Sequence, residues 1–190
     1  MKIVHVTTED ISGGAARAAN RLHTGLRKMG HDSSMFVANR RSKDPHVTAF
    51  DASMDWASRI RRRIRREQVT RDFARYAALR PAGFEIFSDD RSEFGGDLVK
   101  HLPPCDVLNL HWIARFVDYE GFFSAAPKRT PVVWRIADMN PITGGCHVDE
   151  GCGRFLTGCG ACPQLGSNQS DDLSSQVWRR KQNTFEGVEA

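Results

Sequence analysis

The pattern of apolar and polar residues at the start of the chain predicts a strand, a glycine turn and a helix. Residues 2–7 alternate β-branched and polar side chains, residues 12–14 read Ser-Gly-Gly, and residues 15–30 have helical spacing. A second strand is predicted over 34–38. In the predicted helix 15–30, the helical spacing puts five apolar residues on one face: Ala15, Ala18, Leu22, Leu26 and Met29. This order is typical of an α/β fold with a Rossmann-like, doubly wound and mostly parallel sheet.

The middle of the chain has a different pattern. Over 53–80 the apolar residues Trp56, Ile60 and Ile64 repeat among arginines, and Val69 and Phe73 continue the series, which predicts a long basic helix. The segment 84–105 is predicted to be loop with a short helix. Residues 106–111 and 131–136 are apolar runs of the kind found in buried parallel strands, whereas 143–160 is too rich in glycine and cysteine for regular structure.

Composition narrows the class of protein. A chain of 190 residues with 40% hydrophobic and 26% charged residues suits one principal folded domain. The formal net charge of +4 is mild, so a nucleic-acid partner is not expected. The first residues do not have the pattern of a secretion signal, and no run of 18 apolar residues occurs. We therefore expect a cytoplasmic protein, at most peripheral on the inner face of a membrane.

The glycine turn is a candidate binding site. Ser12, Gly13 and Gly14 lie between the end of a strand and the start of a helix, where free N–H groups and the helix dipole favour an anion. A phosphate or a sugar hydroxyl would fit there, with Arg17 from the same SGGAAR segment. The segment lacks the full dinucleotide and P-loop patterns, and a plain tight turn explains it equally well.

Two polar residues follow the later strands. His111 ends the run 106–111, and Asp138 comes just after the run 131–136, where open α/β sheets place their ligands. Histidine there would bind a sugar or a phosphate, and aspartate would orient hydroxyl groups or act as a base. Alternatively, His111 bonds to backbone and Asp138 caps a turn.

Four cysteines predict a metal knuckle over 143–165. Cys146, Cys152, Cys159 and Cys162 are separated by glycines and end in a C-x-x-C step, which favours one tetrahedral structural zinc ion. His147 is an alternative ligand. Two disulfides, a redox C-x-x-C pair and an iron–sulfur cluster are the other interpretations.

The arginine-rich helix has three interpretations. Residues 59–66 read RIRRRIRR, with six arginines in eight positions. The helix over 53–80 is a solvated surface helix, a nucleic-acid patch, or an interfacial helix that meets an anionic membrane. The stripe Trp56, Ile60 and Ile64 favours membrane contact over nucleic acid because phosphate binding alone needs no apolar side.

Three segments together resemble one family. The opening MKIVHVTTEDISGGAARAANRLHTGLRKMGH, the strand DVLNLHW and the stretch PVVWRIADMNPITGGCHVDEGCGRFLTGCGACPQL resemble the N-terminal half of family 4 glycosyltransferases that build bacterial capsule, colanic acid and O-antigen. The resemblance covers most of the chain and thins over 45–95. It implies one half of a GT-B fold, a nucleotide-sugar donor, a saccharide or lipid-linked saccharide acceptor, retention of anomeric configuration and no catalytic metal.

The resemblance also assigns residues. It implies that the glycine loop 12–14 and His111 line the interdomain cleft as acceptor-side or phosphate-side contacts. Where the family usually has a His-Asp pair, this chain has Ala137-Asp138. The family's donor-binding domain would follow the 190 residues, so these residues alone are expected to fold and to be inactive. The competing class is a non-enzymatic, zinc-containing binding module that contacts nucleic acid or protein.

Overall fold

The fold is known from a computed structural model, which describes residues 1–52 and 54–186. Position 53 and residues 187–190, which belong to the predicted helix 53–80 and to the predicted single domain 1–190, lie outside the described part. The strands are β1 (Lys2–Glu9), β2 (Asp32–Asn39), β3 (Val47–Ala49), β4 (Val107–Leu110) and β5 (Val132–Trp134). The α-helices are α1 (Gly14–Lys28), α2 (Trp56–Ala77), α3 (Tyr119–Ala125) and α4 (Leu173–Glu186), and a 3₁₀ helix spans Gly95–His101.

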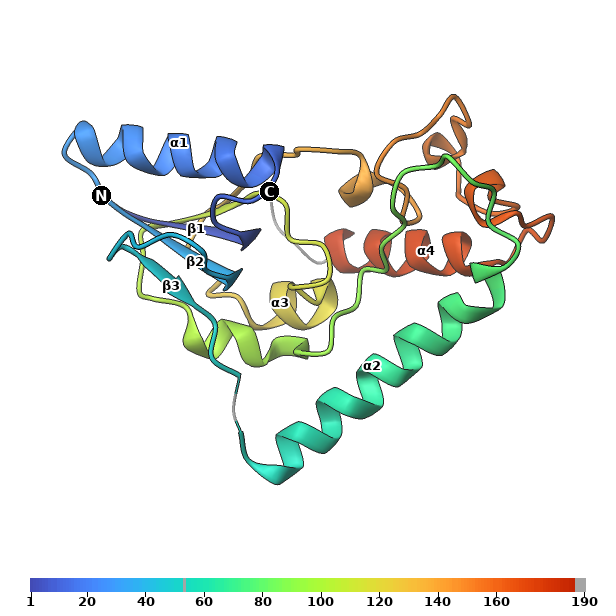
Figure 1. Cartoon of the computed structure of the whole chain (residues 1–190), viewed down its shortest axis with the longest axis horizontal. Coiled ribbons are helices and arrows are strands. Elements are labelled where there is room, and N and C mark those ends of the chain that lie inside the picture. Colours follow the sequence, from blue (N-terminus) through green and yellow to red (C-terminus); the bar gives the residue numbers. More distant parts are fainter. Residues whose placement is uncertain (53, 187–190) are drawn as a thin grey trace.

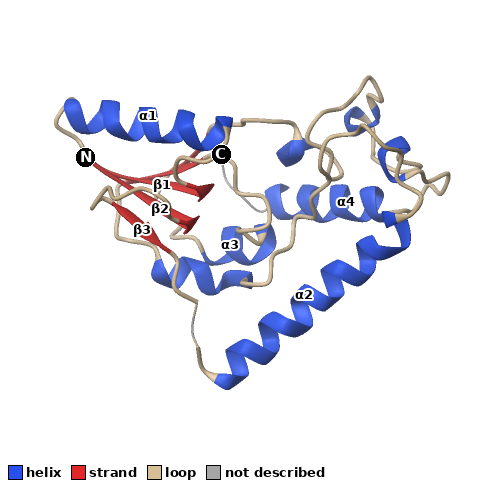
Figure 2. Cartoon of the chain, in the orientation of Figure 1, coloured by secondary structure: helices blue, strands red, loops and turns tan. Residues whose placement is uncertain are grey.

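The five strands form one sheet in the order β3-β2-β1-β4-β5, and every neighbouring pair is parallel. This order places β1 in the centre. Strands β2 and β3 are added on one side of β1 and strands β4 and β5 on the other, as in the first half of a Rossmann-like sheet. Figure 2 shows the sheet with α1 along one side and the shorter helices along the other. The α/β class and the parallel sheet are therefore confirmed.

The pleat of the strands gives the sheet two different faces. Val4 and Val6 of β1 point into an apolar core, with Phe36, Leu108 and Phe122 as neighbours in the same cluster. On the opposite face α1 packs against β1 and β2, and Ala19 joins a small apolar cluster there. The middle of that second face is polar, because His5 and Ser33 alternate with the core residues and are fully buried.

The prediction of which residues form the buried face of α1 is wrong. Ala16, Ala19 and His23 are the buried positions of α1, whereas Leu22 is 38% exposed and Met29 is 73% exposed. The helix is rotated relative to the apolar pattern because His23 is held inside by a 2.9 Å hydrogen bond between its Nδ1 atom and the Ser33 hydroxyl.

Helix α2 runs diagonally away from the sheet, as Figure 1 shows. Asp55 caps its first turn by accepting from the Ser58 N–H. Its contacts with the rest of the chain include an ion pair from Arg65 to Asp118 and a hydrogen bond from the Leu173 N–H to the Tyr76 hydroxyl. Both contacts come from one side of the helix.

The apolar residues of α2 do not form one continuous stripe. Trp56, Ile60 and Ile64 are 76%, 50% and 49% exposed. Because successive helical residues differ by about 100°, the five-residue step from Ile64 to Val69 turns the series by about 140°. Val69 and Phe73 instead line a cavity beside α2. The long basic helix is present, but the prediction that Val69 and Phe73 continue the series of Trp56, Ile60 and Ile64 on one face is wrong.

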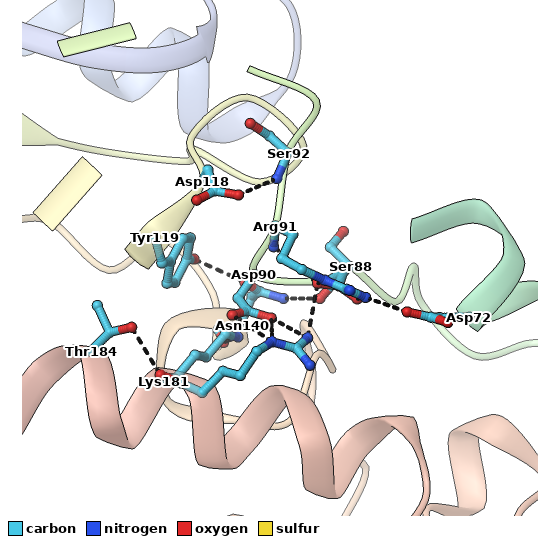
Figure 3. A network of polar contacts seen from close by, with 12 residues as sticks. Asp72, Ser88, Asp90, Arg91, Ser92, Asp118, Tyr119, Asn140, Lys181 and Thr184 are labelled. Atoms are coloured by element: carbon cyan, nitrogen blue, oxygen red, sulfur yellow. Dashed lines mark hydrogen bonds and ion pairs between the residues drawn. The ribbon is translucent and has the colours of Figure 1, made fainter. Parts of the chain in front are cut away.

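A buried polar network holds α4 in place, as Figure 3 shows. Arg180 pairs with Asp90, and Lys181 donates to the backbone carbonyls of Asn140 and Thr143. Burial raises the pKa of Asp90 to about 6, against the pull of Arg180, while burial lowers the pKa of Lys181 to about 8. The network ties the last helix to the segments that surround the predicted site.

Candidate functional site

A cavity of about 330 Å³ lies where the carboxyl ends of β1 and β4 meet the start of α1. Its lining comprises Thr7, Glu9, Ser12, Gly13, Gly14, Ala15, Ala16, Trp112, Ala137 and Asp138. Gly13 stands at the N-cap with φ 89°, a conformation that favours glycine, and no side chain caps the helix. The N–H groups of the first turn are therefore available to a ligand.

The predicted residues divide into two groups. Ser12, Gly13 and Gly14 meet Asp138 around this cavity, although Asp138 is more than a hundred residues away from them in sequence. Arg17 is exposed and is not among the residues that line the cavity. Its backbone N–H bonds to the Gly13 carbonyl as part of the helix.

Asp138 is held by three donors. One oxygen accepts from the Trp112 indole N–H at 2.7 Å and lies 2.6 Å from His147 Nδ1, and the other accepts from the Asn140 N–H at 2.9 Å. Burial alone would raise the pKa of Asp138, but these hydrogen bonds, led by that from His147, lower it below its usual value. Asp138 is therefore ionised at neutral pH and is fixed in orientation.

His147 is a site residue that the sequence did not reveal as a partner of Asp138. Its Nδ1 faces Asp138, and its Nε2 lies 3.0 Å from the Ser88 hydroxyl. Because an ionised carboxylate only accepts, Nδ1 donates to Asp138, and Nε2 shares a hydrogen bond with the Ser88 hydroxyl. Both ring nitrogens are occupied, so the interpretation of His147 as a metal ligand does not agree with this geometry. The sequence signal was limited to its place beside Cys146.

His111 is not among the residues that line this cavity. Its side chain is 1% exposed, and its Nε2 is 3.0 Å from Nδ1 of His5. Burial lowers the pKa of His111 to about 3, so the ring is neutral. Its Nδ1 is buried and has no hydrogen-bond partner in the described part of the chain.

A second cavity, of about 490 Å³, lies beside α2. Its wall combines apolar residues such as Phe73 with four arginines, and it also includes Ser88. Two of these arginines, Arg66 and Arg91, are paired with carboxylates. The hydrogen-bonded series from Asp138 through His147 to Ser88 thus connects the walls of the two cavities.

The four clustered cysteines line one small cavity of about 20 Å³, which has room for a single ion or water. All five cysteines of the chain are free thiols, and the sulfurs of Cys146 and Cys162 are 4.0 Å apart. The Gly144 N–H donates to the Cys159 sulfur at 3.2 Å. In the described residues no group of three or more histidine, cysteine or acidic side chains is already arranged around a metal position.

Comparisons with known proteins give no relative. The chain matches no protein-family model, and no match was found among the curated proteins or the solved structures compared with it. Within the described residues, none of the helices has the length and apolar character needed to cross a membrane.

Proposed function

We propose that this chain is the acceptor-side part of a retaining glycosyltransferase, which moves a sugar from a nucleotide-sugar donor to a saccharide acceptor. The observation that carries the proposal is the chemistry of the 330 Å³ cavity. It combines the carboxylates of Glu9 and Asp138, the indole of Trp112 and the uncapped start of α1.

This combination suits a sugar better than a phosphate. The Asp138 carboxylate accepts hydrogen bonds from hydroxyl groups and repels an anion, whereas that of Glu9 is paired with Arg41; the free N–H groups of α1 donate to sugar oxygens. An aromatic ring provides a flat apolar surface beside these polar groups, as many ligand pockets require. In this proposal Asp138 orients an acceptor hydroxyl and Ser12 to Gly14 bind the sugar ring, while His111, next to Trp112 in sequence, is a buried residue beside the site.

The proposal is tested by titrating the ¹⁵N-labelled chain with a panel of saccharides. The indole N–H of Trp112 donates to Asp138, so a sugar that engages Asp138 should move this resonance and should cause little change in Asp138→Ala. Asp32→Ala is the control, because Asp32 is exposed at the start of β2. If no saccharide moves the Trp112 resonance while a nucleic acid does, the proposed sugar site is wrong and the non-enzymatic binding module is the better interpretation.

We also propose that Cys146, Cys152, Cys159 and Cys162 hold one structural zinc ion. The donor set is soft and complete, so it leaves no open position for catalysis. Zinc–sulfur bonds of about 2.3 Å in a tetrahedron imply sulfurs about 3.8 Å apart, and the Cys146–Cys162 separation of 4.0 Å is close to that value and far from a disulfide. The Gly144 N–H donates to the Cys159 sulfur, as donors around metal ligands do, whereas burial raises the pKa of Cys159 to about 11, so the metal would have to displace its proton.

Elemental analysis tests the zinc site. Near-stoichiometric zinc is expected in the native chain and in Cys105→Ser, whose thiol lies outside the cluster, with loss of zinc in Cys159→Ser. Removal of the metal with a chelator should lower the unfolding temperature, because metal binding contributes to folding. Metal-free native protein with four thiols open to alkylation would contradict the site.

We further propose that α2 contacts an anionic membrane surface and brings a lipid-linked acceptor near the cavity. Trp56, Ile60 and Ile64 lie on the side of α2 turned away from the body of the protein, and arginines flank them. An apolar stripe on an exposed basic helix suits the lipid interface, with about 1 kcal/mol per basic residue from anionic lipid.

Vesicle sedimentation tests this contact. Binding should require anionic lipid, weaken with salt, and fall in Ile60→Ser/Ile64→Ser. Leu156→Ser is the matched control because Leu156 is 75% exposed in another part of the surface. Equal sedimentation with anionic and neutral vesicles would leave α2 as a solvated helix, and preferential binding of nucleic acid would favour the other basic-surface interpretation.

A further inference from the structure

The face of the sheet under α1 contains a row of buried polar side chains, whereas the opposite face packs on a core of aliphatic and aromatic residues. His5, Ser33 and His23 have no exposed surface, and His111 is 1% exposed. Burying such groups is unfavourable unless they are hydrogen-bonded. The row is therefore specified by contacts among its own members, and no apolar packing explains it.

These side chains form one continuous series. Nε2 of His111 is 3.0 Å from Nδ1 of His5, Nε2 of His5 is 3.1 Å from the Ser33 hydroxyl, and that hydroxyl is 2.9 Å from Nδ1 of His23. The remaining nitrogen of His23, Nε2, lies 3.4 Å from a carboxylate oxygen of Asp44, an ion-pair contact rather than a hydrogen bond, and has no hydrogen-bond partner in the described residues. Asp44 is 29% exposed, so the series runs from the protein surface to the carboxyl edge of the sheet.

The charge at one end decides the direction of every hydrogen bond. Burial lowers the pKa of His5 to about 4, that of His111 to about 3 and that of His23 below its usual value, so all three rings are neutral near pH 7. The pKa of Asp44 is lowered, first by the hydrogen bond from the backbone of His46, so it is ionised and only accepts.

The assignment then follows step by step. His23 must carry its proton on Nε2, which leaves Nδ1 to accept from the Ser33 hydroxyl. Ser33 can then only accept from His5, whose proton is also on Nε2, and Nδ1 of His5 accepts from Nε2–H of His111. The last atom in the series is Nδ1 of His111, which is left with a lone pair.

We infer that Asp44 is a positioning residue for His111: acting through His23, Ser33 and His5, it fixes a lone pair on Nδ1 of His111, a buried atom outside the lining of the 330 Å³ cavity that accepts only from a donor that enters the protein interior. A neutral acceptor attracts a sugar hydroxyl or water and repels a phosphate oxygen. The assignment of a sugar hydroxyl rests on the proposed function, whereas the tautomer of His111 does not.

Other charges near the series do not replace Asp44 in this role. Arg27 and His46 act on His23 as positive or potentially positive groups, and Arg135 acts in the same way on His111. Cations disfavour a proton on the facing nitrogens but supply no acceptor. Asn109 is uncharged; its side chain hydrogen-bonds to His5 and thereby raises the pKa of His5, against the larger effect of burial.

A single change at Asp44 should reverse the whole series. Oδ1 of Asp44 accepts from the His46 N–H at 2.8 Å, so the carbonyl of an Asp44→Asn side chain keeps that place and its NH₂ group faces His23. The amide then donates to Nε2, which moves the proton of His23 to Nδ1. Ser33 reorients, and His5 and His111 follow, so that Nδ1 of His111 becomes a donor.

The tautomer of each histidine is measured from the ¹⁵N resonances of the side chains in the 190-residue chain. The expected result is Nε2–H for all three histidines in the native chain and Nδ1–H for all three in Asp44→Asn. In Asp44→Asn/Ser33→Ala only His23 should change, because the hydroxyl that passes the change to His5 is gone. Asp32→Asn, which alters an exposed carboxylate next to Ser33, should leave all three as in the native chain.

The outcomes separate the tautomer from the ligand. Native His111 with its proton on Nδ1 would overturn the inference even if Asp44→Asn failed to fold, and so would a folded Asp44→Asn in which His111 is unchanged. If Asp44→Asn changes His111 equally with and without the Ser33 hydroxyl, Asp44 acts on His111 by a direct electrostatic effect, and transmission through Ser33 is refuted. A saccharide that moves the His111 Nδ1 resonance supports the hydroxyl assignment, whereas movement with inorganic phosphate alone contradicts that assignment and leaves the tautomer result standing.

Discussion

Replacement of Lys181 by methionine tests whether the buried network under α4 stabilises the fold. The Lys181 ammonium is buried, donates to the carbonyl oxygens of Asn140 and Thr143, and lies 5.3 Å from the centre of the Tyr119 ring (Figure 3). Methionine has similar length but no donor. The substitution therefore removes the hydrogen bond from Lys181 to the Thr143 carbonyl and the cation beside the Tyr119 ring.

The expected cost follows from these contacts. Hydrogen bonds from charged groups contribute about 1.5–3 kcal/mol each, and a desolvated cation–ring contact about 2 kcal/mol. Methionine removes the cost of burying an ammonium, which offsets part of this sum. We expect Lys181→Met to lower the free energy of unfolding by about 2–4 kcal/mol.

Urea unfolding followed by circular dichroism measures this difference. Arg179→Met is the control on the same helix, since Arg179 is 55% exposed and pairs with the exposed Asp171, and its loss should cost less than about 1 kcal/mol. A Lys181→Met protein within 1 kcal/mol of the native chain, or more stable than it, would show that the network is not a source of stability.

Two further changes test the packing of the cysteine segment and the turn after β1. Gly144→Ala would place a Cβ atom 2.2 Å from the Ser174 carbonyl oxygen and should destabilise the chain strongly in thermal unfolding, whereas Gly25→Ala in α1, with open space around it, should stabilise by about 0.5–1 kcal/mol; equal effects would contradict the close approach of α4 to this loop. Asp10 is fully buried: burial alone would raise its pKa, but backbone hydrogen bonds from Ser42, Arg41 and Ile11 lower it. The stability from Asp10 is therefore complete above its ordinary pKa of about 4 and lost as the pH falls through the lower folded value. The advantage of the native chain over Asp10→Asn in urea unfolding should shrink between pH 5 and pH 2, and a constant difference would refute the assignment.

The fold could be predicted where the apolar pattern was strong. The runs that became β1, β4 and β5 are short, apolar and spaced for crossovers, so the parallel sheet followed from the sequence. β3 was not predicted, because its three residues, Val47–Ala49, are too few to show a period. The orientation of α1 was missed since a histidine, His23, takes a core position that periodicity assigns to apolar residues.

The site was predictable only in part. The glycine loop and Asp138 were found from their position at the carboxyl edge, a property of all such sheets. Glu9, Trp112 and His147 were not, because nothing in the linear sequence shows that they meet Asp138 or share its cavity. The series from Asp44 to His111 could not be predicted for the same reason: its members lie in separate segments of the sequence, and only the sheet brings them into contact.

The transfer reaction itself tests the central claim most directly. A panel of nucleotide sugars should be offered to the protein made from the whole reading frame and to residues 1–190 alone, with Asp138→Ala and the Asp32→Ala control in each. We predict sugar transfer with retained configuration by the longer protein, strong loss in Asp138→Ala, native rates in Asp32→Ala, and no transfer by residues 1–190 alone. Rapid transfer by the 190 residues, or a longer protein whose rate does not depend on Asp138, would contradict the account.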